Sequence, residues 1–264
     1  MTEGICVMCE LFGLSSRKPH TVNQELKEFF SHCDEHPHGW GLALLDHNNL
    51  VIEKEPVKAN ASRYLKERLR EPITSQIVLA HIRFATIGHM ERRNCHPFTG
   101  TDRSGRKWTL IHNGTIFECE PMQKYFSIQK GETDSERLLL FLLDMMNSEI
   151  IAKGRSLTDE ERFEIVDKLV TTAALQNKLN LLIYDGDLFY AHTNYRGSLY
   201  RLQSEDSVLI STQPLSAGAW EPVPFTQLIA YRREQQVLSG TIHGQEYILD
   251  QKKLDLVMLA FSGL

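Results

Sequence analysis

The chain has 264 residues, of which 42% are hydrophobic, enough to bury a core in one large domain or two small ones. Its net charge of −5, with no run of Lys and Arg, argues against nucleic acid or an anionic membrane as the main partner. No apolar stretch approaches the ~20 residues of a membrane span and no signal segment opens the chain, so we expect a cytoplasmic protein. Its five cysteines are irregularly spaced, which in a reducing compartment predicts free thiols.

Apolar periodicity predicts most of the secondary structure. Helical spacing over residues 22–33 predicts a first helix behind a Thr21 cap. Further helices are predicted over 135–150, entered through Thr133 and Asp134, and over 159–175, capped by Thr158. In chain order, the predicted strands are 41–46, 50–54, 76–85, 107–112, 179–184, 188–192, 198–202, 208–211 and 227–232, with a turn at 46–49. Strands early, helices in the middle and strands late suit two stacked antiparallel sheets with helices outside, in one α+β domain.

Four short patterns fit one reaction built around Cys9. They are Met-Cys-Glu-Leu-Phe-Gly at 8–13, His-Ile-Arg-Phe-Ala-Thr at 81–86, His-Asn-Gly-Thr at 112–115 and Gly-Glu-Thr-Asp-Ser at 131–135. A thiol is the strongest side-chain nucleophile, but only as the thiolate, so it needs a base. None of the patterns places a histidine or carboxylate at a fixed spacing from Cys9. If the mature chain begins at Cys9, its α-amino group, with a pKa of roughly 7.7–8.0, can take the thiol proton.

These patterns, together with His-Gly-Trp-Gly at 38–41, resemble the motifs of the class II glutamine amidotransferases, which are N-terminal-nucleophile (Ntn) hydrolases. The resemblance is greatest to the stand-alone, YafJ-type members. It runs in order from Cys9 to about Asp134 and, more loosely, to residues 220–224. It implies the four-layer αββα Ntn-hydrolase fold for an amidotransferase domain at 9–264. Residues 1–8 are then an extension absent from the mature form, either because Met8 is the true initiator or because the octapeptide is removed.

The resemblance also implies a reaction and a role for each residue. Cys9 attacks the γ-carbonyl of glutamine, and ammonia and then glutamate are released. The Asn113 amide and the Gly114 N–H hold the oxyanion, where losing one donor typically costs ~10²–10³ in turnover. Arg83 holds the substrate α-carboxylate with its planar guanidinium, and Asp134 pairs with the α-ammonium. Structural roles stay open for all of them: a buried thiol, an Asn-Gly turn, an edge ion pair and a helix N-terminal aspartate.

Three further residues are expected at the substrate pocket. Thr86 closes the His-x-Arg-aromatic-Ala-Thr motif, His96 shapes the pocket, and Trp40 packs beside it, although core packing alone would also explain Trp40. Ile87 stands where several amidotransferases have a histidine, so the pocket wall departs from the family there. Histidines are dense in this half of the chain, but a zinc site needs three or four converging ligands, and Pro37 interrupts any helical register. We therefore expect no metal and no cofactor.

The predicted partner is a small molecule, glutamine or another γ-glutamyl compound. Because the amidotransferase domain would use nearly all of the chain, a synthase domain is not expected, and a separate ammonia-acceptor protein is one possible partner. Two alternatives remain open. One is hydrolysis of a γ-glutamyl peptide or glutathione-like thiol, which presents the same α-carboxylate and α-ammonium. The other is a non-catalytic γ-glutamyl or glutamine sensor, favoured if residues 1–8 remain attached.

Overall fold

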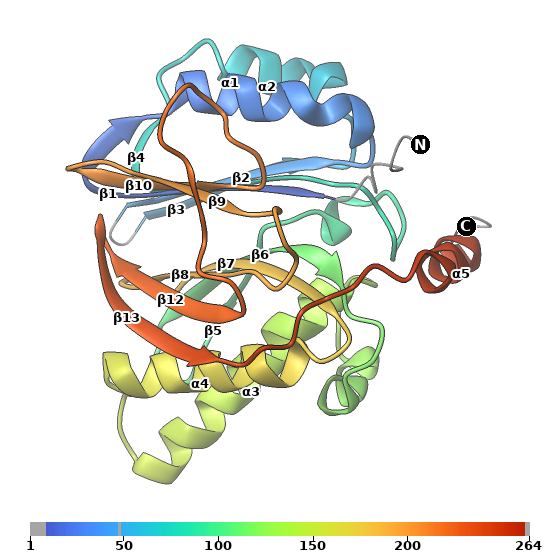
Figure 1. Cartoon of the computed structure of the whole chain (residues 1–264), viewed down its shortest axis with the longest axis vertical. Helices are drawn as coiled ribbons and strands as arrows, with labels where there is room; N and C mark the ends of the chain where they lie inside the picture. Colours follow the sequence, from blue (N-terminus) through green and yellow to red (C-terminus); the bar gives the residue numbers. More distant parts are fainter. Residues whose placement is uncertain (1–8, 47–48, 262–264) are drawn as a thin grey trace.

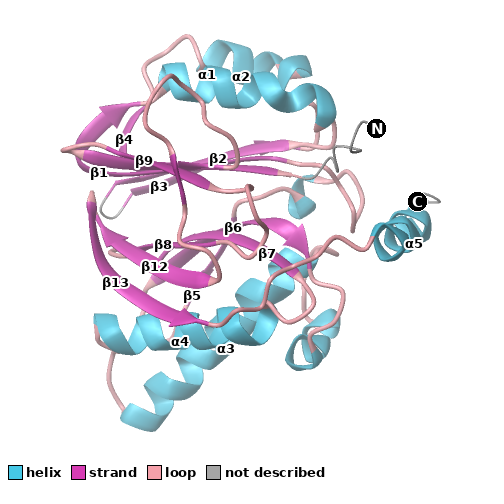
Figure 2. Cartoon of the chain, in the orientation of Figure 1, coloured by secondary structure: helices cyan, strands magenta, loops and turns pink. Residues whose placement is uncertain are grey.

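Two antiparallel sheets stack face to face, with helices on both outer faces (Figures 1 and 2). The computed structural model describes residues 9–46 and 49–261. The predicted extension at 1–8 and half of the predicted turn at 46–49 lie outside these residues. The layers run helix, sheet, sheet, helix, which confirms the predicted four-layer αββα sandwich.

The first sheet carries the segment that follows Cys9. Its order is β11 (Glu221–Pro222), β9 (Tyr200–Gln203), β10 (Ser207–Ser211), β1 (Glu10–Thr21), β4 (Thr74–Ile82), β2 (Trp40–Asp46) and β3 (Asn49–Glu55). Strand β1 therefore lies at the centre, next to β4. Its side chains alternate, since Phe12 and Leu14 face the helices while Leu11 faces the other sheet.

The second sheet carries the predicted oxyanion residues. Its order is β13 (Gln235–Ile242), β12 (Gln227–Arg232), β8 (Phe189–His192), β7 (Lys178–Tyr184), β6 (Lys107–Thr115) and β5 (Phe98–Thr101). A buried apolar layer that includes Leu11, Ile111 and Phe189 fills the space between the two sheets. The sequence predicts neither β1 nor β13, and it leaves open which sheet each late strand joins.

The helices cover the sheets in two pairs. Helices α1 (Asn23–Ser31) and α2 (Arg63–Arg68) pack on the first sheet, and α3 (Asp134–Lys153) and α4 (Asp159–Ala173) pack on the second. A further helix, α5 (Gln251–Phe261), lies near the C-terminus. Short 3₁₀ turns are found at η1 (His32–Glu35), η2 (Ala59–Ala61), η3 (Arg92–Asn94) and η4 (Glu120–Ser127). Among the described residues, no helix is long and apolar enough to cross a membrane.

Local capping signals identify two helix starts correctly and one incorrectly. The Thr133 hydroxyl accepts from the Glu136 N–H at the start of α3, and Thr158 forms a reciprocal capping box at the start of α4. The Thr21 cap was predicted wrongly, because Thr21 ends β1 and its hydroxyl bonds the Thr74 hydroxyl at 2.7 Å. Helix α1 begins instead after Val22, without a side-chain cap.

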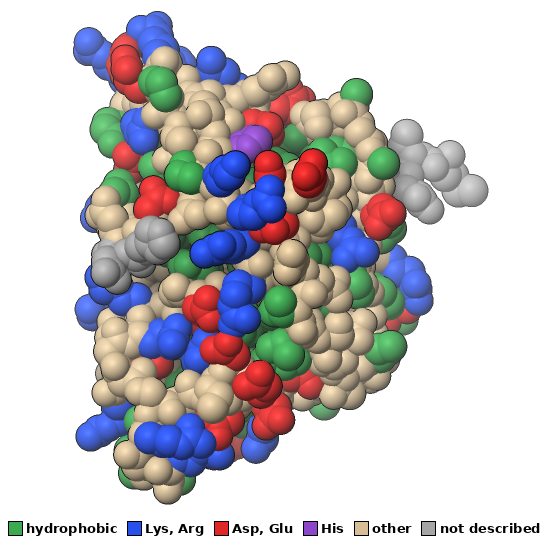
Figure 3. Space-filling model, turned by 90° about the vertical axis from the view of Figure 1, so that its left-hand side faces the viewer, with side chains coloured by type: hydrophobic (Ala, Val, Ile, Leu, Met, Phe, Trp, Pro, Cys, Tyr) green, Lys and Arg blue, Asp and Glu red, His purple; other side chains and the backbone are tan. Residues whose placement is uncertain are grey.

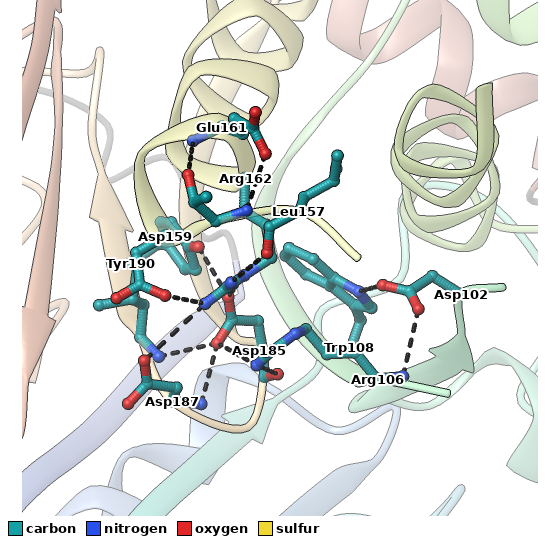
Figure 4. Close-up of polar contacts among 12 residues, drawn as sticks. Asp102, Arg106, Trp108, Leu157, Asp159, Glu161, Arg162, Asp185, Asp187 and Tyr190 are labelled. Atoms are coloured by element: carbon teal, nitrogen blue, oxygen red, sulfur yellow. Dashed lines mark hydrogen bonds and ion pairs between the residues drawn. The ribbon is translucent and has the colours of Figure 1, made fainter. Parts of the chain in front are cut away.

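A buried polar cluster joins α4 to the turn between β7 and β8 (Figure 4). The Arg162 Nε donates to Asp185 Oδ2 at 2.7 Å, and both side chains are almost fully buried. Asp185 also accepts from the backbone N–H groups of Asp187 and Leu188 and from the Tyr190 hydroxyl. Because every buried charge here has partners, the cluster fixes the helix against the sheet.

Charges on the outer surface are mixed. The face seen in Figure 3 carries basic and acidic side chains close together, with no broad area of one sign. This pattern agrees with the modest net charge of −5.

Candidate active site

Strand pairing places Cys9 beside Arg83. In the β1–β4 pair Glu10 lies opposite Ile82, so the residues that directly flank this pair, Cys9 and Arg83, lie next to each other where the two strands end. The Cys9 Sγ donates to the Phe84 carbonyl and accepts from the Phe84 N–H, both at 3.2 Å. The thiol is therefore fixed at the start of the central strand β1, next to the His-Ile-Arg-Phe-Ala-Thr motif.

The surroundings of Cys9 raise its pKa above the usual value for a thiol. Burial is the main cause, and the charge of Asp134 adds to it. The Phe84 N–H and the positive charges of Arg83 and Lys178 act in the opposite direction. Within the part of the chain that the structure describes, the hydrogen bonds of Cys9 Sγ go to the Phe84 backbone and none goes to a histidine. A base for this thiol must come from elsewhere.

Strand β6 of the second sheet brings Asn113 and Gly114 to the end of the sandwich where Cys9 lies. Side chains alternate along this strand, so Asn113 lies on the inner face with Ile111, while His112 turns outward and bonds the Ser135 hydroxyl at 3.0 Å. Asn113 is buried, and its Oδ1 accepts from Lys178 Nζ at 3.1 Å. A Cβ at Gly114 would lie 2.0 Å from the Lys178 carbonyl, so only glycine permits this approach of the strands.

Arg83 is buried and holds the loop that follows it. Its guanidinium donates to the carbonyls of Ile87, Gly88 and His89 at 2.8–3.0 Å. Among the described residues, these three bonds use three of the five guanidinium N–H groups. The isolated edge ion pair considered from the sequence is therefore not the arrangement found.

Asp134 and Thr86 lie on connected elements of the site. Asp134 is the first residue of α3, and its carboxylate accepts from the N–H groups of Ile116 at 2.7 Å and Ser135 at 2.9 Å. The Thr86 hydroxyl contacts the Thr115 hydroxyl at 3.2 Å, directly after Gly114. Each carboxylate oxygen has a second lone pair, so Asp134 keeps acceptor capacity for an ammonium.

His96 is buried and its ring packs against that of His81, with ring centroids 3.9 Å apart and an angle of 30° between the planes. Burial lowers the pKa of both imidazoles well below the usual value, so both are neutral at pH 7. The His96 carbonyl would lie 1.9 Å from a Cβ at Gly41, which explains the second glycine of the His-Gly-Trp-Gly segment. His96 thus forms part of the wall between the two sheets.

Trp40 does not lie with the other predicted site residues. Its indole is buried on the outer face of the first sheet, edge-on to Phe30 and stacked on Tyr64, and its Nε1 donates to Glu55. Packing beneath α1 and α2 accounts fully for its burial. The structure places Trp40 in the core and not beside the predicted pocket, because strand alternation directs its side chain toward the helices.

A pocket of about 380 Å³ opens at Cys9 and Asn113. Its other lining residues include Glu10, His36, Lys178, Tyr195, Tyr200 and Gln213. Most of these lie outside the four motifs and come from the C-terminal third of the chain. The sequence signal that could have found Lys178 is a charged residue leading directly into a strand that is apolar except for Asn180. Among the described residues, no group of three or more His, Cys, Asp or Glu side chains is arranged to hold a metal.

Comparison with known proteins places the chain in a family. The family described as "Glutamine amidotransferases class-II" matches residues 8–204. The chain is 28% identical over 263 residues to the uncharacterized protein MJ1515 of Methanocaldococcus jannaschii, covering 88% of this chain and 72% of that protein. It is also 28% identical over 192 residues to the protein YafJ of Escherichia coli, covering 71% of this chain and 74% of that protein. The chain belongs to the class II glutamine amidotransferases.

Solved structures show the same fold. A Pseudomonas aeruginosa protein named as a predicted glutamine amidotransferase superposes with a TM-score of 0.61 at 20% identity, covering 87% of this chain and all of that one. Glutamine phosphoribosylpyrophosphate amidotransferase from B. subtilis gives a TM-score of 0.62 at 14% identity, covering 89% of this chain and 49% of its own. The predicted Ntn-hydrolase fold is therefore confirmed.

Proposed function

We propose that the protein hydrolyses the γ-amide of glutamine, with Cys9 as the nucleophile. The observation that carries this proposal is the convergence of Cys9 with Asn113 at one pocket, although the two residues belong to different sheets. Arg83 and Asp134 lie near enough to the thiol to influence its pKa. The thiol, an amide donor, a guanidinium and a carboxylate are the groups that this reaction requires.

The proposed reaction proceeds through a thioester. The α-amino group of a chain beginning at Cys9 takes the thiol proton, and the sulfur attacks the γ-carbonyl carbon. The Asn113 Nδ2 and the Gly114 N–H donate to the resulting oxyanion. The substrate nitrogen takes the proton and leaves as ammonia, and water then cleaves the thioester to give glutamate. The raised pKa of Cys9 supports this scheme, because a thiol that stays protonated needs a nearby base.

The amino-acid end of the substrate would lie on the other side of the thiol. Arg83 makes its three loop bonds with three of its five guanidinium N–H groups and would hold the α-carboxylate with the others. The remaining lone pairs of Asp134 would accept from the α-ammonium, with Thr86 and His96 at the wall. Selection for a free amino-acid end distinguishes a γ-glutamyl group from an arbitrary amide.

The active form is proposed to begin at Cys9, because any residue ahead of it turns the amine into an amide without basicity. The test compares ammonia release from glutamine by a chain that starts at Cys9 with that of its Cys9→Ala variant. We expect Cys9→Ala to lose about 10³-fold or more of the activity while keeping its thermal melting temperature. Cys33→Ala and Cys95→Ala, which change buried thiols elsewhere, should remain active.

Each contrary result has a clear meaning. Ammonia release from Cys9→Ala near the level of the parent chain would remove Cys9 as nucleophile. Full activity from a homogeneous chain that intact mass spectrometry shows to start at Met1 or Thr2 would refute the α-amine mechanism. Cleavage of a γ-glutamyl dipeptide by a chain that is inert on glutamine would favour the peptide-hydrolase alternative. Glutamine binding without any turnover would favour the sensor.

A further inference from the structure

Lys178 is a buried lysine beside the proposed nucleophile. It is the first residue of β7, a strand whose residues are all buried, and Lys178 itself is 3% exposed. Fully buried lysines are rare because the ammonium loses its hydration. Such a residue at the edge of the site, lining the same pocket as Cys9, needs a physical explanation.

The contacts of Lys178 connect it to the oxyanion residues. Its Nζ donates to Asn113 Oδ1 at 3.1 Å and lies 4.9 Å from the centre of the Tyr195 ring. Its backbone carbonyl faces His112 Nε2 at 3.2 Å. In the β6–β7 pair Lys178 lies opposite Thr115, the residue after Gly114. The ammonium is therefore held by the same strand pair that presents the Asn-Gly dipeptide.

The bond to Asn113 fixes which way the carboxamide points. An ammonium has only donors, so the Asn113 atom that it contacts has to be the oxygen. With Oδ1 engaged by Lys178, the Nδ2 group is the end left to donate elsewhere. An oxyanion hole needs this orientation, and a carboxamide flipped by 180° would present its oxygen to the developing negative charge.

Lys178 lines the same pocket as Cys9, so its charge acts on the thiol as well. Among the residues that the structure describes, the charges that act on the pKa of the thiol are those of Arg83, which follows β4, Lys178 of β7 and Asp134 of α3. Glu10, Glu35 and His36 also line the pocket at Cys9. Arg83 and Lys178 favour the thiolate, while Asp134 opposes it. Removing the Lys178 charge would leave Arg83 as the one favourable side-chain charge among these three.

We propose that Lys178 is a positioning residue of this active site: its ammonium holds the Asn113 carboxamide with Nδ2 toward the oxyanion, and its positive charge favours the Cys9 thiolate. The first part rests on the proposed function, since an oxyanion forms only if Cys9 attacks a carbonyl. The second part concerns the thiol itself and can be measured without any substrate.

The test replaces Lys178 with methionine, which keeps the length of the side chain but has no charge and no donor. The matched control is Lys107→Met, an exposed lysine on the neighbouring strand β6. In chains that begin at Cys9, we expect Lys178→Met to lower kcat for glutamine by about 10- to 100-fold, with KM within about two-fold. The pH midpoint of Cys9 alkylation by iodoacetamide, read by mass spectrometry of the peptide starting at Cys9, should rise by about half a unit or more. The control should match the parent chain in both.

Two further variants separate positioning from a purely structural role. If Lys178 acts on turnover through Asn113, the double variant Lys178→Met/Asn113→Ala should lose little more kcat than Asn113→Ala alone. Lys178→Arg keeps the charge and the donors, so it should keep the alkylation midpoint of the parent chain and recover part of the turnover. This variant also decides the question if Lys178→Met folds poorly.

Opposite results overturn the inference. A Lys178→Met variant with kcat and alkylation midpoint unchanged, or losses of kcat that simply multiply in the double variant, would exclude positioning of Asn113. A Lys178→Arg variant as impaired as Lys178→Met would indicate a structural role. A raised alkylation midpoint in a protein that never releases ammonia would retain the effect of the charge on Cys9 while rejecting the proposed glutamine hydrolysis.

Discussion

Replacing Asp185 with alanine should strongly destabilise the fold. Asp185 is fully buried, and its carboxylate receives four bonds: the Arg162 guanidinium at 2.7 Å, two backbone N–H groups and the Tyr190 hydroxyl at 2.8 Å. The substitution would leave the Arg162 charge buried without its main partner and would strand three donors. The partly exposed carboxylate of Asp159, 3.0 Å from Arg162, compensates only in part.

The size of the loss follows from this geometry. Removing one partner of a buried ion pair typically costs about 3–5 kcal/mol. For a domain of this size each kcal/mol lowers Tm by roughly 2–4 °C, so Tm should fall by about 6–20 °C. Asp185→Asn keeps the shape and part of the hydrogen bonding but not the charge, so its Tm should lie between that of Asp185→Ala and that of the parent chain.

Thermal unfolding followed by circular dichroism or calorimetry measures this change in Tm. The control is Arg155→Ala, which breaks the pair with Glu161 at 2.7 Å, where the Arg155 side chain is 51% exposed. An exposed pair contributes about 0–1 kcal/mol, so Tm should fall by no more than about 4 °C. If Asp185→Ala and Arg155→Ala melt together, burial of the pair does not determine its contribution, and the reasoning fails.

The site and a buried histidine give two more predictions. Arg83→Ala should raise KM for glutamine by about 10- to 100-fold, the loss of a charge-assisted carboxylate contact, whereas Lys107→Ala should not; equal KM values would count against the assignment. Burial lowers the pKa of His192 to about 3 in the folded chain, whereas the same histidine in the unfolded chain binds a proton near pH 6.5. Its contribution to stability is therefore complete above pH 6.5 and is lost as the pH falls toward 3, about 2 kcal/mol between pH 7 and pH 5. The free energy of unfolding of His192→Asn should drop by about that much less over this interval than that of the parent chain or of His20→Asn, and an equal drop in all three would contradict the sign.

Much of the fold was predictable because its signals are local. The starts of α3 and α4 are encoded within four residues by Thr133 and Thr158, and the apolar runs of β6 and β7 predict buried strands. Strand β1 is less visible, because its second half includes the exposed residues Arg17, Lys18 and Pro19, two of which are charged. Strand β4 ends at Ile82, three residues before the end of the strand predicted over 76–85. The residues beyond it bond the loop before β2, since the Arg83 N–H donates to the Gly39 carbonyl and the Ala85 N–H donates to His38 Nδ1.

The order of the motifs in the sequence identified the family and proposed Cys9, Asn113 and Arg83 for one site, since each motif is contiguous and carries its own residue types. The tertiary structure decided what surrounds them. Pairing of β6 with β7 brings Lys178 against Asn113 across 65 residues of chain, and alternation along β2 turns Trp40 away from the pocket. Local patterns can specify a helix cap or a motif, but which side chains meet depends on strand register and on the face that each strand buries, and these are set only when distant segments pair.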